Sequence, residues 1–122
     1  MTILAAVYVL NAAILILHEI ESAYWKEWEI LGIPGGMSVF VALHLPLVAV
    51  LFWGAIEIVL GTRTGFWIAL ASGACGLLPL FVHRVLVRKP GSFNAPITSI
   101  LLYSNALAGV VVFVLAIMKL TA

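Results

Sequence analysis

Long apolar stretches alternate with short polar breaks along this chain. Four stretches are almost free of charged residues, and they cover residues 2–23, 37–60, 65–87 and 95–118. A helix needs about 20 apolar residues to cross the hydrocarbon core of a bilayer, and each stretch is long enough to do so. Because hydrocarbon offers no partner for an unpaired backbone N–H or C=O, each stretch is expected to be a membrane-spanning α-helix.

The breaks between these stretches are short. Residues 33–36 (Ile-Pro-Gly-Gly) precede the second stretch, residues 61–64 precede the third, and residues 88–92 separate the last two. Connections of this kind join antiparallel neighbours. We therefore predict an all-α fold, an integral membrane four-helix antiparallel (up-down-up-down) bundle, with residues 1–122 as a single transmembrane domain.

Residues 24–32 contain aromatic rings and charges, a mixture typical of the headgroup layer. We expect this segment to be an interfacial extension of the first helix. Four spans place both termini, the Arg63 turn and Lys119 on one face, and the other face carries four basic residues: Lys26, Arg84, Arg88 and Lys89. The excess of basic residues favours the second face as cytoplasmic. We predict a multi-pass protein of the cell membrane with its termini on the non-cytoplasmic side.

Composition supports the same class of protein. The chain has 122 residues, 65% hydrophobic and 9% charged, whereas a soluble domain is about 25% charged. The net charge of +1 provides no basic surface for phosphates, so nucleic acid is excluded as a partner and the lipid bilayer is expected. Small residues at four-residue spacing on the third stretch (Ala69 to Gly73, Ser72 to Gly76) suit close packing, either within the chain or in a homodimer.

All three histidines are expected in one layer of the bundle. With a rise of about 1.5 Å per residue, His18 lies about 9 Å inside the end of its span, His44 about 10 Å and His83 about 6 Å. These three ends belong to the same membrane face. An ionisable side chain inside a span costs on the order of 2.5 to 3.5 kcal/mol, so this convergence requires an explanation.

Two carboxylates lie near His18 in the sequence. Glu21 shares a helical face with His18, and Glu19 points roughly 100° away from that face. Imidazole and carboxylate groups are suitable ligands for zinc, iron or manganese. The candidate metal ligands are therefore His18, Glu21, His44 and His83, and the candidate catalytic carboxylates are Glu19 and Glu21. The same groups are also compatible with a hydrogen-bonded structural network or with a proton relay.

Glu57 stands near the opposite face, six residues before Arg63. We expect it to reach the interface and to pair with Arg63. A buried proton-coupling carboxylate is the alternative interpretation.

The residues His18-Glu19-Ile20-Glu21, followed by an aromatic and charged segment, resemble a motif that closes the first helix in small bacterial membrane proteins of uncharacterised function. They also resemble the HXXEE family, named for a His-x-x-Glu-Glu motif at a similar place. Ser22 stands where that family has its second glutamate. The resemblance implies a four-helix membrane fold with a His/Glu site and implies no particular reaction.

Three functional hypotheses follow. The first is a small polytopic membrane protein whose intrabundle His/Glu site binds a metal and acts as a metal-dependent hydrolase or redox enzyme on a lipid-like small molecule. The second is a proton-coupled transporter that works as a dimer, with Glu19, Glu21 or Glu57 lining a cavity between protomers. The third is a structural or cofactor-carrying subunit of a larger membrane complex.

Overall fold

The structure, a computed structural model, describes residues 2–87 and 90–122. Most of these residues belong to helices joined by short connections. Four helical segments are long and apolar enough to cross a membrane. They are α1 (Ile3–Tyr24), α3 (Gly36–Val59), the third span Arg63–Leu86 and α6 (Pro96–Thr121). The third span consists of α4 (Arg63–Cys75), α5 (Leu78–Phe81) and the π-helix η1 (Val82–Leu86), and a short helix, α2 (Glu27–Ile30), follows α1. The predicted all-α fold is confirmed.

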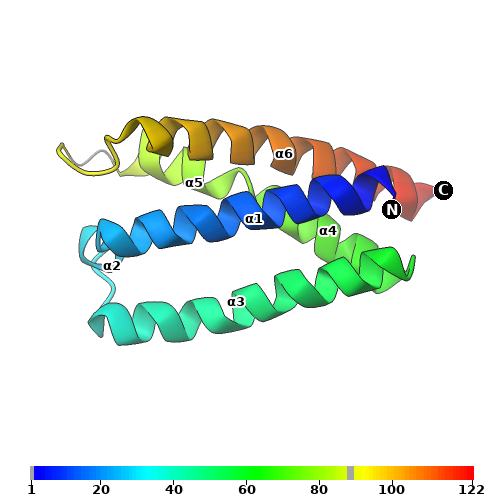
Figure 1. The fold of residues 1–122 in the computed structure, drawn as a ribbon, viewed down its shortest axis with the longest axis horizontal. Coiled ribbons are helices and arrows are strands. Elements are labelled where there is room, and N and C mark those ends of the chain that lie inside the picture. Colours follow the sequence, from blue (N-terminus) through cyan, green and yellow to red (C-terminus); the bar gives the residue numbers. More distant parts are fainter. Residues whose placement is uncertain (1, 88–89) are drawn as a thin grey trace.

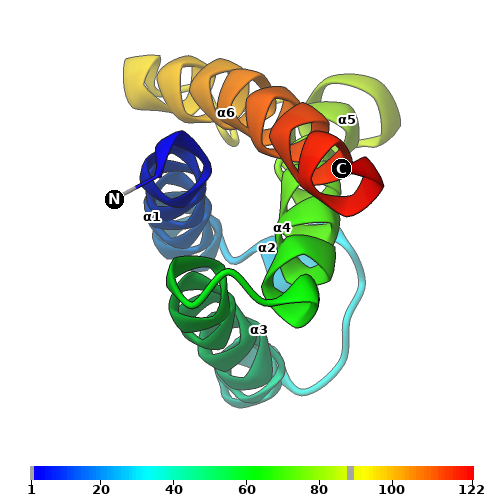
Figure 2. The same cartoon turned by 90° about the vertical axis from the view of Figure 1, so that its right-hand side faces the viewer.

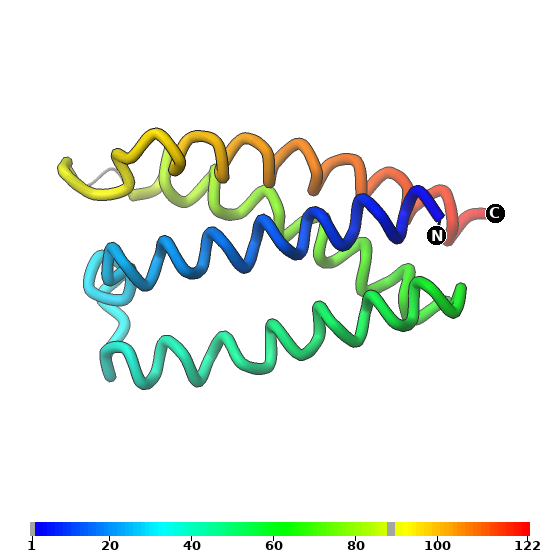
Figure 3. Tube along the Cα trace, in the orientation of Figure 1, coloured from blue at the N-terminus to red at the C-terminus, as the bar shows by residue number. Residues whose placement is uncertain are grey.

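The four spans run up and down around a common axis (Figure 1). The end-on view in Figure 2 shows α6 beside both α1 and α4, and α3 below α1 and α4. Both chain ends and the turn between α3 and α4 lie at one end of the bundle, which we call the terminal end (Figure 3). The short helix α2 lies at the opposite end, which we call the α2 end.

Local sequence accounts for where the helices begin. The Thr2 side chain accepts a hydrogen bond from the N–H of Ala5, and the Thr62 side chain accepts one from the N–H of Gly65. These caps satisfy N–H groups that have no partner within their own helix. Pro96 occupies the first position of α6, where its missing N–H is not needed.

The apolar core lies at the terminal end of the bundle. It consists of residues from all four spans: Leu4, Ala5, Tyr8, Ile58, Ala69, Val112 and Ala116. Elsewhere, large apolar side chains such as Leu45, Val59 and Leu107 are exposed on the outer faces. An outer surface of this kind is consistent with contact with a lipid bilayer.

The small residues of the third span allow α4 and α6 to approach closely. A Cβ on Gly73 would lie 2.7 Å from the backbone oxygen of Gly109, and a Cβ on Gly109 would lie 2.6 Å from the backbone oxygen of Gly73. Ala69 and Ser72 are buried on the same part of α4. This small-residue face therefore packs within the chain.

Replacing Gly73 by Ala is expected to destabilise the bundle. The added methyl group would clash with the α6 backbone, and overpacking of this kind costs about 1–3 kcal/mol. The measurement is the free energy of unfolding in a detergent titration followed by circular dichroism. Ala74→Val is the control, since Ala74 is the exposed neighbour of Gly73, and an equal effect of both variants would contradict the close α4–α6 contact.

Candidate metal site

Two histidines and one glutamate meet inside the α2 end of the bundle. His18 comes from α1, Glu27 from α2 and His83 from η1. Each offers one ligand atom, and these atoms all lie within 4.8 Å of one another. The three residues are only 3%, 8% and 7% exposed, respectively. We call these residues the His18–Glu27–His83 cluster.

A left-handed residue brings Glu27 into this cluster. The helix α1 ends at Tyr24, and Lys26 has φ 52° and ψ 54°, so the chain turns instead of continuing as the expected extension of the first helix. The next turn of helix places Glu27 inside the bundle, while Glu29 stays exposed and pairs with Lys26 at 3.7 Å. Glu27 is not among the ligands predicted from the sequence, because both glutamates belong to the same charged segment and no residue pattern there distinguishes the inward one.

The π-helix sets the position of His83. The N–H of Val87 bonds to the carbonyl oxygen of Val82 at 2.8 Å, five residues back, so this turn is wider than an α-helical turn. Single π-turns of this kind occur frequently at functional sites. The ring centroids of His83 and His18 lie 5.2 Å apart in an edge-to-face arrangement.

Phe93 covers the cluster from the segment before α6. Its ring centroid lies 3.9 Å from that of His83 and 6.2 Å from that of His18. Phe93 is 7% exposed and has φ 51°, a conformation that a bulky residue rarely adopts. Packing of its ring over the two imidazoles offsets this backbone cost.

Glu27 is paired within the cluster. Its Oε1 lies 3.0 Å from Nε2 of His83. Burial alone would raise the pKa of Glu27, but the donor groups of His83 and Ser22 nearby and the charges of His83 and His18 outweigh it, so the pKa is lowered. The cluster therefore favours the ionised carboxylate, which is the form that binds a metal.

Glu21 lies beside the cluster. Its Oε2 is 3.9 Å from Nδ1 of His18, and its Oε1 accepts a hydrogen bond from the hydroxyl of Thr98 on α6. Within residues 2–87 and 90–122, neither Glu21 Oε2 nor His18 Nδ1 has a hydrogen-bond partner. Glu21 is therefore placed to orient the imidazole of His18 after a small movement.

His44 and Glu19 form a separate pair. Nε2 of His44 lies 2.7 Å from Oε2 of Glu19, and Nδ1 of His44 lies 2.6 Å from the carbonyl oxygen of Phe40. Since a carbonyl oxygen only accepts, Nδ1 is the donor to Phe40. The structure thus brings together His18 and His83 of the predicted ligands, and it places His44 on a different partner. This pair matches the hydrogen-bonded network that the sequence also allowed.

Glu57 lies at the terminal end, far along α3 from His44. Its carboxylate accepts hydrogen bonds from the Trp53 ring N–H, at 3.0 Å, and from the Thr62 hydroxyl. These bonds link the end of α3 to the cap of α4. Glu57 therefore holds the α3–α4 turn through Trp53 and Thr62, where the sequence led us to expect Arg63 as the partner.

Comparison with known proteins identifies a family that the chain matches over most of its length. The profile of a family of unknown function (DUF6713) matches residues 4–119. No curated protein and no solved structure matches the chain. The similarity of the motif on the first span to the HXXEE family therefore remains a resemblance.

Replacing Glu27 by Ala is expected to destabilise the metal-free protein more than replacing Glu29 by Ala. Loss of Glu27 leaves a buried imidazole without its partner, which costs about 1–3 kcal/mol. Loss of Glu29 removes an exposed ion pair with Lys26, which is worth about 0–1 kcal/mol. The free energy of unfolding, measured with a chelator present, distinguishes the two variants, and equal losses would contradict the buried position of Glu27.

Proposed function

The chain belongs to DUF6713, a family whose description states no function, and we propose from its own geometry that it is a membrane protein that binds a divalent transition metal ion. The ligands are His18, Glu27 and His83. The observation that carries the proposal is the convergence of these three side chains, from three separate elements, to within 4.8 Å inside an apolar bundle.

The distances support this proposal. Metal–ligand bonds of about 2.0–2.2 Å in a tetrahedral site put neighbouring ligand atoms roughly 3.3–3.6 Å apart. His83 Nε2 and Glu27 Oε1 lie 3.0 Å apart, and all three ligand atoms fall within 4.8 Å. Side-chain movements of about 1 Å would complete the geometry.

The type of ligand supports it as well. Two imidazoles and one carboxylate form the ligand set of catalytic zinc sites and of non-haem iron sites, and both leave coordination positions for water or substrate. A bound metal would supply an activated water for hydrolysis or a redox centre, and its identity distinguishes the two reactions. Glu21 is our candidate for the carboxylate that orients His18. Glu19, held by His44, remains the second candidate catalytic carboxylate.

The charge distribution also leads us to propose an orientation. Lys26 and Arg84 lie at the α2 end, and the sequence adds Arg88 and Lys89, which fall outside the described residues. The terminal end has Arg63 and Lys119. By the positive-inside rule, the His18–Glu27–His83 cluster would face the cytoplasm and the termini the opposite side.

Metal analysis tests the proposal directly. Protein purified in a neutral detergent is expected to contain about one zinc, iron or manganese ion per chain, measured by mass spectrometry of the elements. His18→Ala and His83→Ala are each expected to weaken binding by more than about 100-fold, because loss of a ligand exceeds the effect of losing an outer-shell partner.

His44→Ala is the matched control, since His44 is a histidine of the same layer that pairs with Glu19 instead. This variant is expected to keep its metal. A wild-type protein that neither carries a stoichiometric metal nor takes up added Zn²⁺, Mn²⁺ or Fe²⁺ would refute the proposal. Equal loss in the His44 and His18 variants would refute the assigned ligands.

A further inference from the structure

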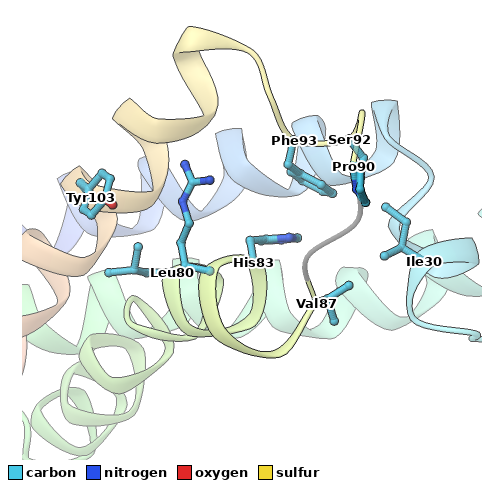
Figure 4. Close-up of a pocket in the computed structure, with 9 residues that line it drawn as sticks. Ile30, Leu80, His83, Val87, Pro90, Ser92, Phe93 and Tyr103 are labelled. Atoms are coloured by element: carbon cyan, nitrogen blue, oxygen red, sulfur yellow. The ribbon is translucent and has the colours of Figure 1, made fainter.

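A cavity of about 690 Å³ opens beside the His18–Glu27–His83 cluster. Figure 4 shows His83 among the residues that line it, with Leu80 and Tyr103 to one side and Val87 and Ile30 to the other. His83 thus belongs both to the cluster and to the cavity wall. Cavities of about 300–1,000 Å³ accommodate small organic ligands.

A basic side chain lines the cavity. Among the described residues that line it, Arg84 is the only charged one, and no carboxylate lines it. Nη2 of Arg84 donates to the Ser99 hydroxyl at 2.8 Å, which holds the guanidinium against α6. A guanidinium presents its N–H donors in a planar fork that matches the oxygens of a phosphate or carboxylate. This wall is therefore suited to an oxyanion.

Most of the other described residues that line the cavity are apolar. Ile30, Leu80 and Val87 all line the cavity. Arg84 lies two residues before the end of the third span at Leu86, which places it about 3 Å inside that end. This depth suits a lipid headgroup. Leu80 lies about 6 Å deeper on the same span, on the side toward the hydrocarbon together with Tyr103 (Figure 4). Val87 and Ile30 lie on the side of the α2 end.

We propose that this cavity binds an anionic lipid, with its phosphate held by Arg84 and the first part of its apolar chain against Leu80 and the ring of Tyr103. This inference rests on the proposed metal site. Because His83 belongs both to the cluster and to the cavity wall, a lipid in the cavity would be the substrate next to a bound metal. A lipid is favoured over free phosphate as the ligand, because only a lipid has an apolar chain to bury against the apolar part of the wall.

The test is native mass spectrometry of the full chain in neutral detergent, with the metal removed. Dioleoyl phosphatidate is expected to bind with one molecule per chain. Arg84→Gln is expected to weaken this binding by at least about tenfold, as for loss of a charge-assisted hydrogen bond. Arg63→Gln, which removes an arginine at the other end of the same span, is expected to leave the affinity unchanged.

Two further probes separate the possible ligands. Dioleoyl phosphatidylcholine, whose choline offsets the phosphate charge, is expected to bind at least about tenfold more weakly than phosphatidate. Inorganic phosphate at millimolar concentration is expected not to displace the lipid. Equal binding of both lipids, displacement by inorganic phosphate, or an unchanged affinity in Arg84→Gln would each overturn the proposal.

Two controls keep the result interpretable. If Arg84→Gln does not give a monodisperse helical protein, Arg84→Lys keeps the charge and loses the fork, and a severalfold weaker affinity is expected. The lipid titration uses the metal-free protein, so its outcome does not depend on whether the His18–Glu27–His83 cluster binds a metal. Lipid binding thus fails or persists independently of metal binding, so failure of one proposal is distinguishable from failure of the other.

Discussion

A polar group in the hydrocarbon core of a bilayer has no water to pair with, and this constraint shapes the interior of the bundle. Asn11 on α1 donates to both the carbonyl and the hydroxyl of Ser72 on α4. Thr98 on α6 donates to Glu21 on α1. Each bond joins two spans, so the polar side chains fix neighbouring helices relative to one another. The His18–Glu27–His83 cluster continues this pattern at the α2 end.

The same constraint explains why the fold could be predicted from the sequence. Spanning segments must be long, apolar and helical, and short breaks leave only antiparallel neighbours. The layer of the histidines follows from the rise of a helix alone, and the structure places His18 and His83 with ring centroids 5.2 Å apart. Each of these inferences depends on length and depth, which one sequence contains.

Which residues form the site depends on features that the length and depth of the spans do not determine. Glu27 enters because Lys26 adopts a left-handed conformation, which no residue type at that position requires. His83 is buried on the same face as Ser72 and Pro79, as the helical period gives, but the π-turn that contains it does not follow from the sequence pattern. His44 turns toward Glu19 because α3 faces α1 there. Direction around a helix axis and the path of a connecting segment come from tertiary packing, and single-sequence periodicity does not contain them.

The main apolar cluster lies at the terminal end of the molecule, and the strained backbone positions lie at the α2 end. The main apolar cluster holds all four spans together at the terminal end, and the Gly73–Gly109 contact holds α4 against α6 near the middle of the bundle. Both non-glycine residues with positive φ in the described part of the chain, Lys26 and Phe93, flank the cluster at the α2 end. Such conformations cost about 1–2 kcal/mol each and persist only where the surrounding structure enforces them. Lys26 directs Glu27 inward and Phe93 lays its ring over His83, so both conformations act on the same cluster. Both residues lie in the segments that connect helices at the α2 end, so the path of these connections, together with the spans, assembles the cluster.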